Sequence, residues 1–86
     1  MSAFYGIVIL FYFNEDRHEG RPHFHAEFAG RRVSYDIETV RPFGGRLPRR
    51  PHRLVVKWAR LHREELLANW QRARKEKALM PIDPLP

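Results

Sequence analysis

The spacing of apolar residues changes once along the chain, and this change limits the fold more than any other feature. Up to residue 37, apolar residues form short stretches rich in aromatic and β-branched types or alternate with polar ones, as they do in strands. From residue 49 to about residue 77 they recur with a period near 3.6, which is the period of a helix. A block of strands followed by a helix predicts a domain of the α+β class.

Three antiparallel strands are expected in the first half of the chain. Residues 4–13 are apolar on both faces, which is typical of a central strand. Residues 23–29 form the second predicted strand and residues 32–37 the third, joined by a tight turn at Gly30 and Arg31. We therefore expect an antiparallel β-meander of three strands, or of four.

One long amphipathic helix is expected over residues 49–77, where it would cover an apolar face of the sheet. The two Trp residues lie in its apolar arc, so both are predicted to be core residues rather than platforms for stacking bases. This arc comprises Leu54, Val55, Trp58, Leu61, Leu66, Trp70 and Ala73.

Polar runs and breaker residues mark the ends of these elements. Residues 14–22 are a polar loop that we expect to be mobile, and residues 41–48 lead into the helix. Closely spaced Pro residues predict an extended tail over residues 81–86, which leaves residues 1–80 as a single domain. A chain of 86 residues has a small core, so a large closed active-site cavity is not expected.

The positive charge is concentrated in the second half of the chain. The formal net charge is +6, to which residues 1–40 contribute −2, residues 41–77 contribute +9 and Asp83 contributes −1. Seven basic residues and no acidic one lie between residues 46 and 63, namely Arg46, Arg49, Arg50, Arg53, Lys57, Arg60 and Arg63. Solvated helices usually mix the two signs, so this run predicts contact with RNA, DNA or an acidic protein. The alternative is a solvated outer face alone.

The absence of cysteine excludes disulfides and thiolate metal sites. The apolar start of the chain is about ten residues long, which is too short to span a bilayer, and it lacks the basic region of a signal peptide. We therefore expect a cytoplasmic protein with no membrane partner.

Residues 22–28 read PHFHAEF, and the alternation of a strand places His23, His25 and Glu27 on one face. Phe24 and Phe28 point to the other face and supply the apolar burial that the strand needs. We therefore expect the two His side chains to be reachable by solvent and to serve function more than folding.

Polar residues also interrupt the apolar arc of the predicted helix, at His62, Glu65 and Asn69. Buried polar groups need partners, and the strand that carries the two His residues is the obvious source of them. We expect His62 and Glu65 to face the sheet and to lie near His25.

Two kinds of chemistry fit these residues, beside the simpler interpretation that His23 and His25 are surface or hydrogen-bonded rim residues. The two imidazoles are candidate ligands of Zn or a similar ion; apart from this we expect no cofactor. Two imidazoles can also act as base and acid on a phosphodiester while Arg stabilises the transition state, as in a metal-independent ribonuclease. The candidate catalytic residues are His23, His25, His62 and Glu65.

Several segments resemble a small bacterial family known as domain of unknown function 4160. They are FYGIVI, PHFHAEF, YDIE, GRLP and the helical signature W-x-x-x-H-x-E-E-L-x-x-N-W, which here runs from Trp58 to Trp70. Members are often encoded beside a second small protein, as in toxin–antitoxin pairs. The resemblance therefore implies a toxin-like or regulatory member of a two-gene module that acts on or binds nucleic acid. The alternative is a non-catalytic module that binds a cognate small protein.

Overall fold

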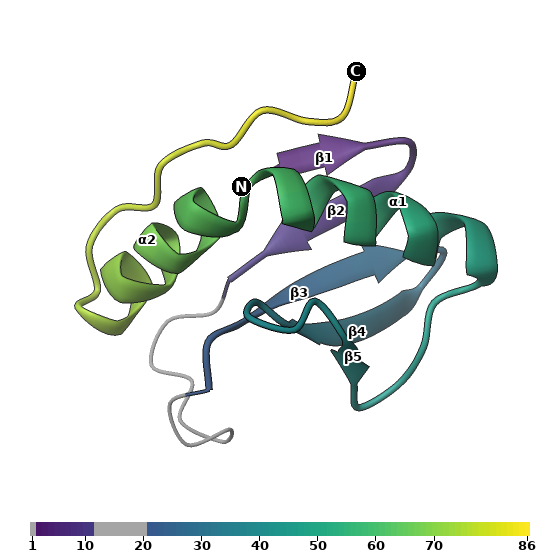
Figure 1. Ribbon diagram of the computed structural model, residues 1–86, viewed down its shortest axis with the longest axis horizontal. Coiled ribbons are helices and arrows are strands. Elements are labelled where there is room, and N and C mark those ends of the chain that lie inside the picture. Colours follow the sequence, from purple (N-terminus) through teal and green to yellow (C-terminus); the bar gives the residue numbers. More distant parts are fainter. Residues whose placement is uncertain (1, 12–20) are drawn as a thin grey trace.

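The structure is a computed structural model that describes residues 2–11 and 21–86. It consists of one antiparallel sheet and two helices (Figure 1). The strands are β1 (Ser2–Phe4), β2 (Ile7–Leu10), β3 (His23–Phe28), β4 (Arg31–Asp36) and β5 (Pro42–Phe43), and the helices are α1 (Arg49–Leu61) and α2 (Arg63–Arg74). The α+β class is confirmed. The expected mobile loop at 14–22 falls almost wholly outside the described residues.

The sheet has five strands rather than the three or four that we expected. They are hydrogen-bonded in chain order, so the predicted meander is present. The predicted strand at 4–13 is a hairpin instead: Tyr5 and Gly6 have φ of 50° and 79°, and Phe4 pairs with Ile7 across them. Two residues with positive φ make the type of turn that suits a two-residue hairpin.

The turn between β3 and β4 lies one residue earlier than predicted. Ala29 and Gly30 occupy it with φ of 49° and 80°, and Phe28 pairs with Arg31 on its far side. The fifth strand, β5, lies inside the segment that we expected to be a loop, where Pro42 pairs with Tyr35 of β4.

The predicted single helix is broken at His62. This residue has φ of −118° and ψ of 25°, and its N–H is shared between the carbonyl oxygens of Trp58 and Ala59. A straight helix over residues 49–77 would be about 43 Å long. The longest dimension of the whole molecule is 33 Å, so such a helix would extend past the sheet. The break keeps both Trp58 and Trp70 buried, as predicted.

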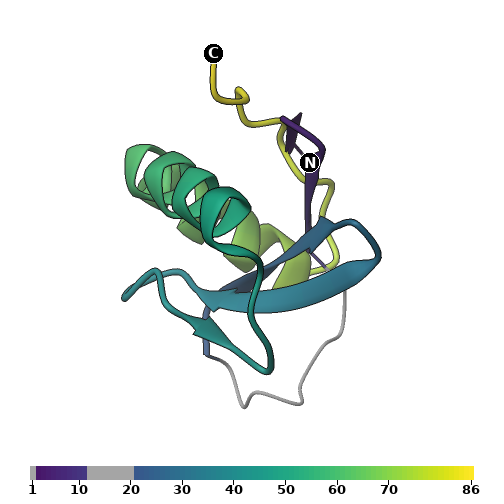
Figure 2. The ribbon, with the colours of Figure 1, turned by 90° about the vertical axis from the view of Figure 1, so that its right-hand side faces the viewer.

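The core lies between the helices and one face of the sheet (Figure 2). Phe24 of β3 stacks on Tyr35 of β4 with ring centroids 5.4 Å apart, and Trp58 of α1 contacts Phe24 at 6.0 Å. The other large buried members are Phe4, Ile7, Ile9, Val33, Ile37, Val55, Leu66 and Trp70.

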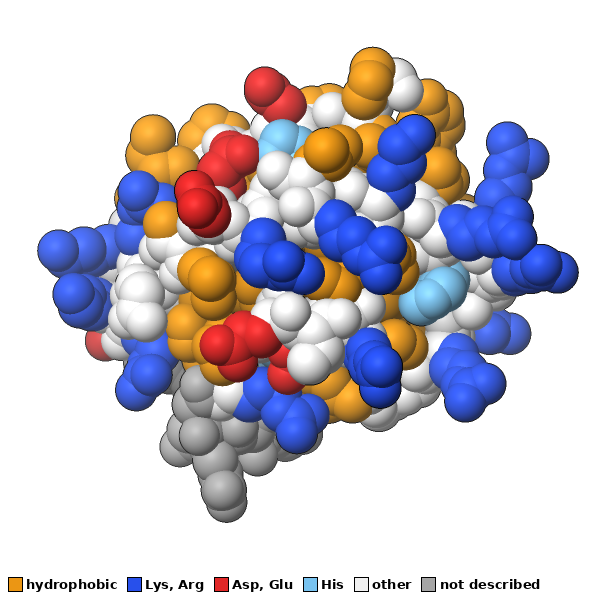
Figure 3. Space-filling model, viewed as in Figure 1, with side chains coloured by type: hydrophobic (Ala, Val, Ile, Leu, Met, Phe, Trp, Pro, Cys, Tyr) orange, Lys and Arg blue, Asp and Glu red, His pale blue; other side chains and the backbone are white. Residues whose placement is uncertain are grey.

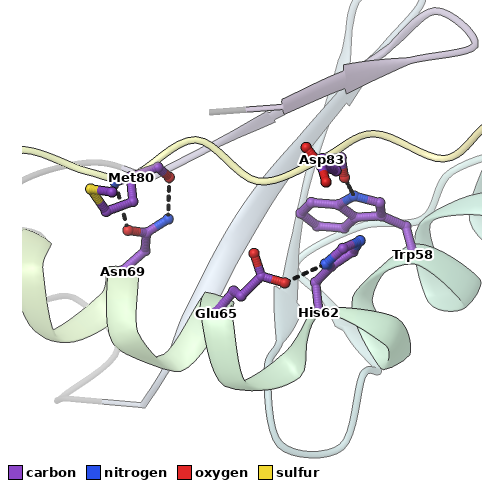
Figure 4. Close-up of polar contacts among 6 residues, drawn as sticks. All are labelled: Trp58, His62, Glu65, Asn69, Met80 and Asp83. Carbon is purple, nitrogen blue, oxygen red and sulfur yellow. Dashed lines mark hydrogen bonds and ion pairs between the residues drawn. The ribbon is translucent and has the colours of Figure 1, made fainter.

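The chain after α2 runs back along the helices toward β1 as an extended segment (Figure 1). The side chain of Asn69, which is fully buried, accepts a hydrogen bond from the N–H of Met80 at 2.9 Å and donates one to its carbonyl at 2.8 Å. The indole N–H of Trp58 donates to the carbonyl of Asp83 at 2.8 Å (Figure 4). Ile82 is buried, so the tail contributes to the core.

Neither helix in the described part of the chain is long and apolar enough to cross a membrane.

Candidate nucleic-acid interface

The outer face of α1 carries a row of cationic side chains (Figure 3). At about 100° per residue, the five basic residues of α1 fall within an arc about 100° wide, opposite the buried side of the helix. The two remaining cations of the predicted run flank α1, one in the preceding loop and one at the start of α2. All seven are exposed, as predicted: Arg46, Arg49, Arg50, Arg53, Lys57, Arg60 and Arg63. We call these seven residues the basic face.

The start of α1 is an unfavourable place for cations if only folding is considered. Helix N-termini carry a partial positive charge that acidic residues stabilise, and no acidic residue lies in the first turn of α1. Arg49 and Arg50 occupy that turn instead, and Arg46 precedes it. The charge therefore accumulates where it weakens the helix and strengthens attraction for an anion.

None of the seven cations forms an ion pair with another described residue. Ion pairs between other described residues include Arg21 with Asp36, Arg32 with Glu27, and His62 with Glu65. Arg63 Nε makes only a long hydrogen bond, 3.3 Å, to the carbonyl of Ile37. Within the described part of the chain, the charges of the basic face are therefore left for solvent or for a partner.

A shallow hollow of about 430 Å³ opens in the middle of the basic face. Its lining is mixed: an imidazole, three cations and two aliphatic side chains, from His52, Arg53, Val56, Lys57, Arg60 and Leu61. Leu61 is 64% exposed, although the sequence pattern placed it in the apolar arc. That prediction is wrong: at about 100° per residue, Leu61 lies only about 40° from Lys57, at the margin of the basic side of α1.

His52 is a residue of this surface that the sequence did not indicate. Its Nδ1 lies 2.9 Å from the hydroxyl of Tyr35, which is buried in the sheet. The two rings are stacked with centroids 5.8 Å apart, and burial raises the pKa of Tyr35 to about 12. The link joins residues 17 positions apart, so no local spacing reveals it.

The histidines of the PHFHAEF segment lie elsewhere and are buried, with 2% of His23 and 6% of His25 exposed. Their rings meet edge to face at 5.1 Å, and His23 also contacts Trp70 of α2 at 4.9 Å. Their Nδ1 atoms lie 2.8 Å from the carbonyl of Arg21 and 3.2 Å from the hydroxyl of Ser34, respectively. The expectation that solvent reaches both side chains is wrong, because strand alternation defines a face but not what covers it.

His62 and Glu65 form a pair with each other at the break between the helices (Figure 4). Nδ1 of His62 lies 2.6 Å from Oε1 of Glu65, and the imidazole packs against Trp58 at 5.5 Å. The Glu65 side chain is 52% exposed. The expected cluster with His25 is not observed: no interaction between described residues joins either side chain to the strand histidine.

The four candidate catalytic residues therefore form two pairs on different elements, His23 with His25 on β3 and His62 with Glu65 at the helix break. Within residues 2–11 and 21–86, no group of three or more His, Asp or Glu side chains is arranged to hold a metal ion. Asn69, the third polar residue of the arc, bonds to Met80 of the tail and to Arg72.

A comparison with protein families gives a match over residues 6–71 to the family described as domain of unknown function (DUF4160). The chain belongs to this family. The DUF4160 match begins in the β1–β2 turn and ends in α2. It therefore includes the basic face, the His23–His25 pair and the His62–Glu65 pair. Searches of the curated proteins and of the solved structures gave no significant match.

Proposed function

We propose that this protein binds nucleic acid through the phosphate backbone, with the basic face of α1 as the interface. One observation carries the proposal: seven exposed cations surround and cover one helix face, and none is neutralised by a described acidic residue. A polyanion supplies the missing charges.

The energetics of α1 support a functional origin for this charge. Arg49, Arg53 and Lys57 follow one another at spacings of four residues, and like charges at this spacing destabilise a helix by about 0.2 to 0.5 kcal/mol per pair. Repulsion with the N-terminal end of the helix adds to this cost. Bound phosphates remove both penalties, so part of the binding energy is relief of repulsion already present in the free protein.

The spacing of the cations suits a backbone contact. Four residues of helix rise by about 6 Å, so Arg49, Arg53 and Lys57 stand in a row with one cation per turn. A helix fits the major groove of a B-form duplex, which is about 12 Å wide, and can also lie along a backbone. Contacts from these cations to phosphates carry no sequence information, so a backbone-directed face predicts binding with weak sequence preference.

A toxin-like or regulatory role in a two-gene module, and the small protein partner that it implies, are further parts of this proposal. They are supported by the family resemblance, and nucleic-acid binding by the basic face is the activity through which such a role would be exerted.

The proposal is tested with two variants that remove the same charge from different places. Arg53→Gln with Lys57→Gln neutralises the middle of the basic face, whereas Arg74→Gln with Lys75→Gln neutralises exposed cations at the end of α2. Binding to labelled RNA and DNA duplexes is measured by fluorescence anisotropy at low salt. We expect the first variant to lose about tenfold or more in affinity and the second to lose little. Equal losses in the two variants would show that net charge, not the basic face, drives binding.

A further inference from the structure

The lining of the hollow in the basic face combines positive charge with apolar surface. Three cations and one imidazole surround it, and Val56 and Leu61 provide aliphatic surface within it. Among the described residues, no acidic side chain lines it. A ligand that suits this lining is anionic on one side and less polar on the other.

The bond between Tyr35 and His52 fixes which nitrogen of the imidazole carries a proton. The Tyr35 hydroxyl is fully buried, and its only described partner is Nδ1 of His52. If the imidazole donated this bond, the hydroxyl hydrogen would be left buried without an acceptor, at a cost of about 1 to 3 kcal/mol. Tyr35 therefore donates, and the neutral imidazole carries its proton on Nε2.

This tautomer gives the hollow a directed donor. Nδ1 of His52 is engaged by the Tyr35 hydroxyl, so the Nε2–H on the other side of the ring points away from that hydroxyl. The His52 side chain is half-buried and lines the hollow. Ring stacking on Tyr35, itself stacked on Phe24 at 5.4 Å, restricts the orientation of the imidazole. A hydrogen-bond donor held in this way is suited to a single acceptor such as a phosphate oxygen.

We infer that the hollow is a subsite for one phosphate group of the bound nucleic acid, in which His52 is a binding residue and Tyr35 positions it. Arg53, Lys57 and Arg60 supply the charge, the Nε2–H of His52 supplies the directed hydrogen bond, and Val56 and Leu61 contact the sugar attached to the phosphate. The inference rests on the proposed function but names a specific site within it.

The first test uses NMR on the wild-type protein with inorganic phosphate alone. Long-range proton–nitrogen spectra should show the Nε2–H tautomer for His52 in the free protein. Millimolar phosphate should then shift the imidazole signals of His52 and the backbone signals of Arg53 and Lys57. If phosphate leaves His52 unmoved, the subsite is wrong, whether or not the protein binds nucleic acid. Shifts caused by a poly-glutamate peptide but not by phosphate would also overturn it, in favour of an acidic protein partner.

The second test uses variants at His52, with their folding checked by circular dichroism and thermal melting. His52→Leu removes the donor and should weaken duplex binding about 3- to 10-fold, the effect of one hydrogen bond. His52→Gln retains an amide donor near the position of Nε2 and should recover part of the loss. Gln71→Ala, at an exposed position on α2, should bind as wild type. Wild-type affinity in His52→Leu, with salt-dependent binding intact, would refute the subsite and leave the proposed function standing.

Discussion

The hydroxyl of Tyr35 and Nδ1 of His52 lie 2.9 Å apart, and this bond connects β4 of the sheet to a residue of α1 that lines the hollow in the basic face. The stack of Phe24, Tyr35 and His52 thus begins in the core and ends among cations. The proposed binding surface thus includes one imidazole whose orientation is restricted by the core.

Tyr35 should make the stability of the protein fall at alkaline pH. Burial raises its pKa from 10.0 to about 12, so the folded protein holds this proton more tightly than the unfolded chain does. Its contribution is complete below pH 10 and is lost as the pH rises toward 12, so that about 1 kcal/mol should be lost by pH 11. Urea unfolding between pH 8 and pH 11 measures this loss. The stability of the Tyr35→Phe variant should depend less on pH over this range. If the wild type and the variant lost stability in parallel, the alkaline loss would not come from Tyr35.

Asn69 should be important for stability because its carboxamide holds the tail. Replacement by Ala leaves the N–H and the carbonyl of Met80 without their side-chain partner and opens a small cavity, for which we expect a loss of about 2 to 4 kcal/mol. Chemical denaturation measures the loss, and limited proteolysis should show earlier cleavage after residue 77. If Asn69→Ala were as stable as the exposed control Gln71→Ala, the tail would contribute little to folding.

His23 and His25 should affect folding before they affect binding. Both are buried, His23 against the Trp70 ring and His25 against His23, so replacing the two by Gln should lower the free energy of unfolding by about 1 to 3 kcal/mol. The folded fraction should keep its affinity for nucleic acid, which is measured at low temperature. The opposite result, unchanged stability with lost activity, would restore the catalytic interpretation of the PHFHAEF segment.

The fold class followed from the sequence because period-2 and period-3.6 patterns are local properties. The hairpin at Tyr5 and Gly6 did not, because it lies inside an unbroken apolar run and only Gly6 marks it. The break at His62 is marked by neither Pro nor Gly. The helices on its two sides are held by buried Trp58 and Trp70 and by the tail, and these are tertiary contacts that the sequence pattern does not show.

The candidate site, like the fold, could be predicted from the sequence only in part. Exposure of the seven cations could be predicted because a run of like charges has no stable place inside a small core. Burial of His23 depends on Trp70, which is 47 positions along the chain, and no spacing within the strand shows that contact. His52 was missed because its significance comes from Tyr35 on another element.

The salt dependence of nucleic-acid binding tests the central claim most directly. Each phosphate that the basic face neutralises releases counterions, so the logarithm of the association constant should fall linearly with the logarithm of the salt concentration. For the wild-type protein we predict a slope of roughly −3 to −5, which corresponds to several phosphates contacted at once. A slope near zero, or no binding at low salt, would contradict a backbone-directed interface on α1.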